Sequence, residues 1–300
     1  MKTLKESILD IDSVQSGIDP IKIIGDWCKE NIRGTYKIDP KTLDINSDGK
    51  IEIANKKLIE FPNFIHFGTV EGYFDCSNCN SLQSLKGAPQ KVGGDFICYH
   101  CDNLTSLEGS PKEVGRHFNC SFCNSLQSLK GAPKEVGGDF ACSYCKNLTS
   151  LEDAPEKVDG CFECSRCNSL QSLKGVPKKI DEYFNCSGCN NLTSLKGAPE
   201  KVAEYFNCSG CNNLTSLNGA PEKVGWYFDC SYCKNLTSLE GSPKEIGGGF
   251  NCSYCKNLTS LEGSPEEVNN HFYCYNCRRQ FTKDDVKKVC NVGGNIVIKI

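Results

Sequence analysis

The chain has 300 residues, with 34 basic and 37 acidic side chains and a formal net charge of −3. This balance produces no long-range field that would attract polyanions, so neither nucleic acid nor a membrane surface is an expected partner. The 28 glycines, 12 prolines and 23 cysteines point to a repeated unit, and no apolar run resembles a signal peptide or a membrane-spanning helix.

Residues 1–50 form a leader that does not follow the later repeat. Within it, residues 2–9 and 20–32 have the composition of short helices. The segment 44–51 reads D-I-N-S-D-G-K-I and resembles the start of an EF-hand loop, but the twelfth place is Asn55 where a bidentate glutamate is needed. We therefore interpret this segment as a turn that precedes the repeats.

A 22-residue repeat dominates the rest of the chain. Phenylalanine recurs at this spacing from Phe74 to Phe272 without one insertion. With that Phe as place 1, the unit reads F-x-C-S-x-C-x-N-L-T-S-L-x-G-A-P-x-x-V-G-G-x. Nine full copies span 74–271, a degenerate copy at 51–73 is expected to cap their N-terminal end, and 272–300 holds a partial copy and a C-terminal cap. A fixed period of this length is typical of a solenoid.

Each unit is expected to form one coil of short strands and turns. The stretch V-G-G-x-F-x-C-S alternates apolar and polar residues, as a half-buried strand does, with Phe and Cys pointing inward. The Gly and Pro residues of G-x-P-x-x-V-G-G disfavour a helix. Stacked coils can bury one another's apolar residues and pair their strands in parallel. The predicted fold is a mainly β solenoid with a parallel sheet and short helices at the N-terminus and in the C-terminal cap.

The repeat resembles the leucine-rich repeat pattern L-x-L-x-x-(N/C)-x-x-L. It is most similar to a bacterial and tailed-phage subgroup with units of the form L-T-S-L-x-G-A-P-K-x-V-G-G-x-F-x-C-S, and the similarity covers residues 51–300. Place 6 often holds Asn in that subgroup, whereas this chain has Cys in all ten copies. The resemblance implies a leucine-rich-repeat-like solenoid that serves as a binding surface, encoded by a phage or by a bacterium carrying one.

The repeat pattern ends after Cys277. The run T-K-D-D from Thr282 resembles a capping box that opens a helix through Val289, and residues 295–300 alternate like a final strand. Apolar residues at helical spacing in this tail are expected to cover the last coil: Phe281, Val286, Val289 and Cys290.

Ten Cys-x-x-Cys pairs, eighteen residues apart, match the spacing of zinc sites. The first possible set from adjacent coils is Cys76, Cys79, Cys98 and Cys101. The alternative is that both cysteines occupy inward places as small buried hydrophobes stacked in ladders. We favour reduced core thiols, with neither metal nor cofactor, and keep a metal-binding cysteine array as the rival interpretation.

Catalysis is not expected. The four histidines lie at different or distant places of the unit, so no cysteine has a recurring base beside it.

Variation between copies concentrates at places 22, 2, 4 and 5, which should line the exposed face of the sheet. Aromatic side chains at these and neighbouring places form a candidate partner-binding set: Tyr183, Tyr205, Tyr227, Trp226, Phe122, Tyr144, Tyr232 and Tyr254. Such rings can stabilise neighbouring strands by stacking or form a contact surface, and both interpretations stay open. The sequence therefore predicts a non-enzymatic, protein-binding or structural scaffold. We expect a monomer, cytoplasmic in a bacterial or host cell or associated with a virion.

Overall fold

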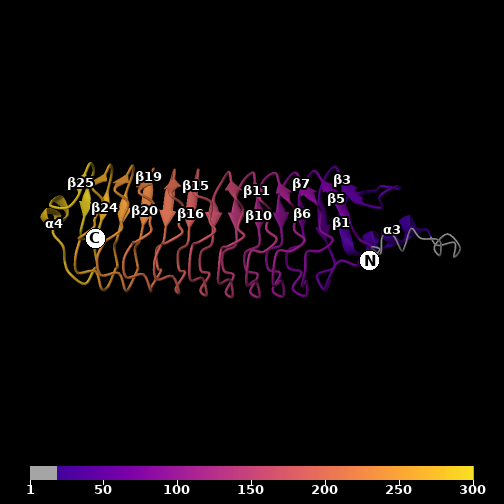
Figure 1. Ribbon diagram of the computed structural model, residues 1–300, viewed down its shortest axis with the longest axis horizontal. Helices are drawn as coiled ribbons and strands as arrows, with labels where there is room; N and C mark the ends of the chain where they lie inside the picture. Colours follow the sequence, from indigo (N-terminus) through magenta and orange to yellow (C-terminus); the bar gives the residue numbers. More distant parts are fainter. Residues whose placement is uncertain (1–18, 300) are drawn as a thin grey trace.

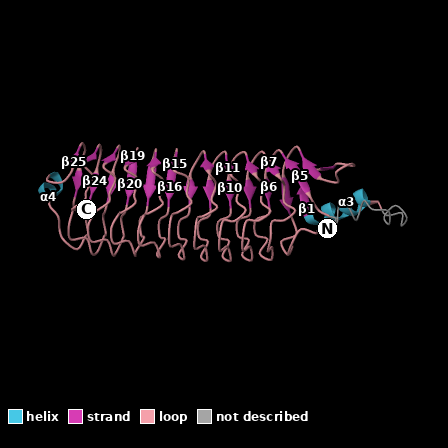
Figure 2. Ribbon diagram, viewed as in Figure 1, coloured by secondary structure: helices cyan, strands magenta, loops and turns pink. Residues whose placement is uncertain are grey.

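The computed structural model describes residues 19–299, and it forms one elongated solenoid in which successive coils stack side by side (Figure 1). Strands run along one side of the stack, while loops and turns build the opposite side (Figure 2). This arrangement confirms the predicted mainly β solenoid with a parallel sheet and a short helix towards each end. The helix expected at residues 2–9 lies outside the described residues.

The long sheet contains thirteen strands, and all neighbours are parallel except the first pair. The repeat fixes the register, because Phe140 lies opposite both Phe118 and Phe162. In their order across the sheet the strands are β1 (Ile32–Gly34), β4 (Ile51–Ile53), β6 (Phe74–Asp75), β8 (Phe96–Ile97), β10 (Phe118–Asn119), β12 (Phe140–Ala141), β14 (Phe162–Glu163), β16 (Tyr183–Asn185), β18 (Tyr205–Asn207), β20 (Tyr227–Asp229), β22 (Phe250–Asn251), β24 (Phe272–Tyr273) and β26 (Ile296–Val297).

A second strand in each coil, at places 18 and 19, pairs along the solenoid in a seven-stranded and a six-stranded sheet. The seven-stranded sheet contains β2 (Lys37–Ile38), β3 (Ile45–Ser47), β5 (Phe67–Val70), β7 (Lys91–Val92), β9 (Glu113–Val114), β11 (Glu135–Val136) and β13 (Lys157–Val158). The six-stranded sheet contains β15 (Lys179–Ile180), β17 (Lys201–Val202), β19 (Lys223–Val224), β21 (Glu245–Ile246), β23 (Glu267–Val268) and β25 (Asn291–Val292).

The stretch that the sequence suggests as one strand is thus two strands separated by a corner at places 20 and 21. Glycine occupies half of these corner positions in the nine full copies, and neighbouring coils approach closely there. A Cβ atom at Gly137 would overlap the backbone oxygen of Gly115 in the preceding coil. Alternation of apolar residues predicts inward and outward faces but not such a bend.

The core is a set of parallel side-chain ladders. Phe at place 1, Cys at places 3 and 6, Leu at places 9 and 12, and Val or Ile at place 19 are buried in the repeats. The phenylalanine rings stack along the axis, with centroids 5.4 Å apart between Phe118 and Phe140 and 5.1 Å apart between Phe206 and Phe228. Aromatic burial of this kind is a major source of stability.

The N-terminal end of the stack is closed by α3 (Pro20–Asn31). Asp19 caps this helix by accepting a hydrogen bond from the backbone N–H of Ile21. The helix buries Ile24 and Cys28 in the core. The EF-hand-like segment is divided between strands β3 and β4, which agrees with its interpretation as a turn between extended segments. No helix within residues 19–299 is long and apolar enough to cross a membrane.

The C-terminal end carries α4 (Lys283–Lys287), opened by the expected capping box between Thr282 and Asp285. Val286 is fully buried, and Phe281 and Cys290 are also in the core. The expectation that Val289 covers the last coil is wrong, because the helix ends at Lys287 and Val289 is 41% exposed. Strand β25 then pairs with β23 at the end of the six-stranded sheet, and β26 pairs with β24 at the end of the thirteen-stranded sheet.

Candidate functional site

The cysteine array is held together by a repeated thiol hydrogen bond. The Cys145 thiol at place 6 donates to the carbonyl oxygen of Cys120 at place 3 of the preceding coil, with a distance of 3.2 Å from Sγ to O. The same bond recurs in nine successive coils, from Cys101 to Cys277, at 3.1–3.3 Å. Each place-6 thiol therefore satisfies a buried backbone acceptor.

Burial raises the pKa of several thiols in the array, most of them at place 3. It raises the pKa of Cys120 and Cys230 well above the usual thiol range and that of Cys79 to about 12. A hydrogen bond with Cys101 and burial likewise raise the pKa of Cys76. All 23 cysteines are free thiols. Because metal ligation requires thiolates, the thiol-to-carbonyl hydrogen bonds favour a structural role over the rival zinc array at Cys76, Cys79, Cys98 and Cys101.

A second titratable cluster lies on the sheet face and was not expected from the sequence. One possible ligand atom from each of Asp139, Cys161 and Glu182 lies within 4.8 Å of the others. The Cys161 thiol donates to a Glu182 carboxylate oxygen at 3.3 Å, and one Asp139 oxygen accepts the Cys161 backbone N–H at 2.8 Å. The other Asp139 oxygen lies 3.1 Å from His117 Nδ1. Contacts with one another and with His117 are enough to explain why these three side chains lie together.

Three of the predicted site residues form a row on adjacent strands, which we call the tyrosine ladder: Tyr183, Tyr205 and Tyr227. Their ring centroids are 6.1 Å and 5.8 Å apart. Tyr205 is 39% exposed, and the neighbouring Trp226 is 49% exposed. Tyr183 and Tyr227 are half-buried, and desolvation raises the pKa of both phenols. In the tyrosine ladder, the two outer rings are thus packed against the sheet, and the central ring of Tyr205 is exposed to solvent.

The other four predicted site residues, Phe122, Tyr144, Tyr232 and Tyr254, occupy place 5, in the turn that follows each strand. Place-5 residues have a φ between 55° and 69° in all ten copies. We call this row the turn ladder: Asn78, His100, Phe122, Tyr144, Arg166, Gly188, Gly210, Tyr232, Tyr254 and Asn276. Seven of the eight predicted site residues therefore belong to two separate rows, and the eighth, Trp226, lies beside the tyrosine ladder.

The left-handed backbone of the turn ladder is unfavourable for large side chains, at about 1 to 2 kcal/mol for each residue. Backbone hydrogen bonds between coils hold it in place: the N–H of Tyr144 donates to Ser165 O at 2.8 Å, and that of Tyr232 to Ser253 O at 2.9 Å. Aromatic residues are uncommon at such a positive φ, whereas glycine adopts the same backbone conformation without strain.

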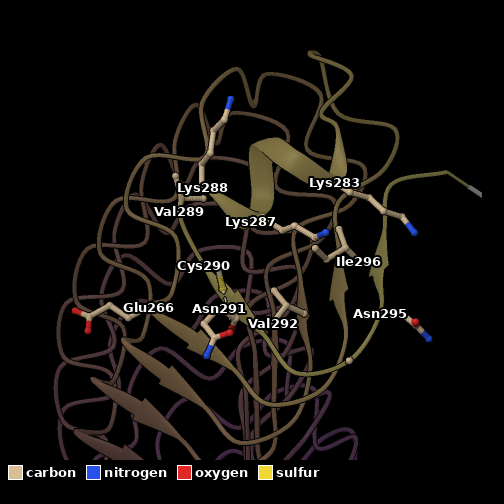
Figure 3. A pocket seen from close by; sticks show the side chains of 11 residues that line it. Glu266, Lys283, Lys287, Lys288, Val289, Cys290, Asn291, Val292, Asn295 and Ile296 are labelled. Atoms are coloured by element: carbon tan, nitrogen blue, oxygen red, sulfur yellow. Dashed lines mark hydrogen bonds between the residues drawn. The ribbon is translucent and has the colours of Figure 1, made fainter.

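Cavities occur at two places of interest. One, of about 760 Å³, lies at the C-terminal end beside α4 (Figure 3). Lysine side chains from α4 and the residues after it line this cavity together with Val292 and Ile296. The last coil is therefore incompletely covered. The other, of about 560 Å³, lies along the turn ladder between Tyr144 and Tyr232. Sequence reasoning did not single out Arg166 as a site residue, although it lines this second cavity.

Comparisons with known proteins give no relative: no protein-family model matches the chain, and no curated protein or solved structure matches it. Function must therefore be inferred from the two ladders and their surroundings.

Proposed function

We propose that the protein is a non-enzymatic scaffold that binds a partner protein through the tyrosine ladder and Trp226. The observation that carries this proposal is the exposure of Tyr205 on β18 and of Trp226 at the corner that precedes β20. Stacking between strands can explain the half-buried Tyr183 and Tyr227. It does not explain an exposed ring and an exposed indole beside them, and such aromatic residues are enriched in the energetically important parts of protein interfaces.

The surroundings of the ladder suggest the charge of the partner. Glu182 and Glu204 are exposed at place 21 of adjacent coils, and neither makes an ion pair with any residue in the described range 19–299. A partner with an apolar centre and basic residues around it would complement this surface.

We also propose that the repeats belong to the leucine-rich-repeat class and that the protein comes from a phage or from a bacterium carrying one. An asparagine amide could donate to the place-3 carbonyl as the place-6 thiol does, so cysteine at this place is compatible with that repeat class. We propose that the protein acts in the cytoplasm of a bacterial or host cell or in association with a virion. The support for a phage source is the sequence resemblance of residues 51–300.

Replacing Tyr183, Tyr205 and Tyr227 together with Ser should weaken partner binding at least about tenfold, because it removes the aromatic centre of the surface. The measurement is affinity capture from bacterial or virion lysate, followed by titration of the captured protein against the wild-type and variant chains. The matched control is Lys86→Ser with Glu108→Ser, on another edge of the coils. Loss of binding in the control, with binding unchanged in the tyrosine variant, would show that the assignment of the binding face is wrong.

A further inference from the structure

The turn ladder carries two stacks of rings along one edge of the solenoid. In the first, the centroids of His100 and Phe122 are 4.7 Å apart, and those of Phe122 and Tyr144 are 4.3 Å apart in a parallel stack. In the second, Tyr232 stacks on Tyr254 at 4.4 Å. The residues that carry these rings have a left-handed backbone conformation that favours glycine. Backbone strain of this kind is commonly retained where the side chains have a function.

A gap separates the two stacks because place 5 is glycine in two successive coils. The space above Gly188 and Gly210 is the cavity of about 560 Å³. A Cβ atom at Gly210 would meet no atom closer than 3.8 Å, so lack of room does not account for the missing side chain. The Arg166 guanidinium, 5.5 Å from the Tyr144 ring centroid, and Tyr232 lie on either side of the gap.

The gap is wide enough for more than one flat ring. Arg166 and Tyr232 belong to coils three steps apart, which corresponds to about 14 Å, since paired strands are spaced about 4.8 Å apart. Ser187, Ser209 and Asn190 add polar groups to the lining.

This edge is locally basic although the whole chain is slightly acidic. From Tyr144 onward, places 4 to 8 contain no Asp or Glu, while places 5, 7 and 8 supply cations: Lys146, Arg166, Lys234, Lys256, Arg278 and Arg279. Lys146, Arg166 and Lys234 make no ion pair with any residue that the structure describes.

Many of the acidic residues are paired with lysines on other edges of the coils, and of the cations named here Arg279 pairs with Asp285 at 3.4 Å. Along other edges of the coils, lysines and glutamates pair with each other, as in Lys130–Glu108 at 2.7 Å and Lys178–Glu200 at 2.9 Å. The net charge of −3 excludes a long-range field but does not describe the turn ladder from Tyr144 onward, where places 4 to 8 contain cations and no Asp or Glu; before it, Asp102 occupies place 7.

We infer that the turn ladder binds single-stranded nucleic acid. Bases would stack on the exposed ring faces and enter the gap between Arg166 and Tyr232, and the unpaired cations would contact the phosphates. Rows of aromatic side chains interleaved with cations are how proteins bind single strands with little sequence preference. A duplex offers no free base faces to these rings, so it should bind more weakly. This second function is independent of the tyrosine ladder.

The test uses the full-length protein and a fluorescein-labelled twelve-nucleotide oligothymidine, with binding followed by fluorescence anisotropy. We expect saturable binding that is at least tenfold tighter than that of a duplex of the same length and that weakens between about 50 and 200 mM salt. Tyr144→Gly with Tyr232→Gly should reduce single-strand affinity at least tenfold, and Lys146→Gln with Lys234→Gln should reduce its salt dependence. Circular dichroism would confirm that the variants fold, which the glycines already present at place 5 lead us to expect.

The control is the triple Tyr183, Tyr205 and Tyr227 to Ser variant, which should bind the oligonucleotide as the wild type does. Failure of this inference is therefore distinguishable from failure of the proposed protein-binding function. No anisotropy change up to about 100 μM protein, equal affinity for the duplex, or unchanged affinity in the glycine variant would overturn the inference. So would the finding that the glycine variant instead loses the partner protein, since the ladder would then be a protein-binding edge.

Discussion

Replacing Phe162 with Ala is expected to lower the free energy of unfolding by about 3 to 5 kcal/mol. The ring is fully buried near the middle of the solenoid, with centroids 5.2 Å from Phe140 and 5.8 Å from Phe184. Because a coil contacts mainly its neighbours, the weakened coil should also uncouple the two halves of the stack. A urea titration followed by circular dichroism should then show two transitions in place of one.

Tyr205→Ala is the matched control for this prediction. It removes a ring from the next-but-one strand of the same sheet, but one that is 39% exposed. The expected loss is below about 1 kcal/mol. If Phe162→Ala destabilises the protein no more than Tyr205→Ala does, the phenylalanine ladder is not the main support of the stack.

Removing residues 280–300 is expected to convert the protein into a species that associates as its concentration rises. This tail contributes β25, the last strand of the six-stranded sheet, and β26, the last strand of the thirteen-stranded sheet. It also places Val286 over the core. Without it, the edges of β23 and β24 and the ring of Phe272 would be open to a second copy. Light scattering over a range of concentrations measures the effect.

Val289→Ser serves as the control, because this side chain is already 41% exposed and should not affect association. A truncated protein that stays monomeric and melts at the wild-type temperature would show that the tail is not a cap. The tail would then be free for another role.

The solenoid could be predicted because its determinants recur in every copy. Phe at place 1, Leu at places 9 and 12 and Val or Ile at place 19 can all be buried only if equivalent residues stack. The division into two strands per coil could not be predicted from alternation alone, since it depends on how closely the glycine corners of adjacent coils approach each other.

The site was predictable only in part, for similar reasons. Sequence variation indicates Tyr205 and Tyr232 as surface residues, but the left-handed backbone at place 5 puts Tyr232 in a turn rather than on the strand. The thiol-to-carbonyl bonds of the cysteine ladder depend on contacts between coils, so Cys-x-x-Cys spacing alone could not separate them from zinc ligation. Net charge, as a single sum, conceals the basic character of the edge around Arg166.

Deletion of one whole coil tests most directly whether each 22-residue unit is an interchangeable coil. Removing residues 118–139 joins His117 to Phe140, which restores the repeat register, whereas removing 118–128 shifts every following apolar residue by half a coil. The first variant should keep the wild-type circular dichroism spectrum and unfold cooperatively, and the second should be unfolded or aggregated. If removal of the whole coil disrupts the fold as severely as removal of half a coil, the units do not form a regular stack.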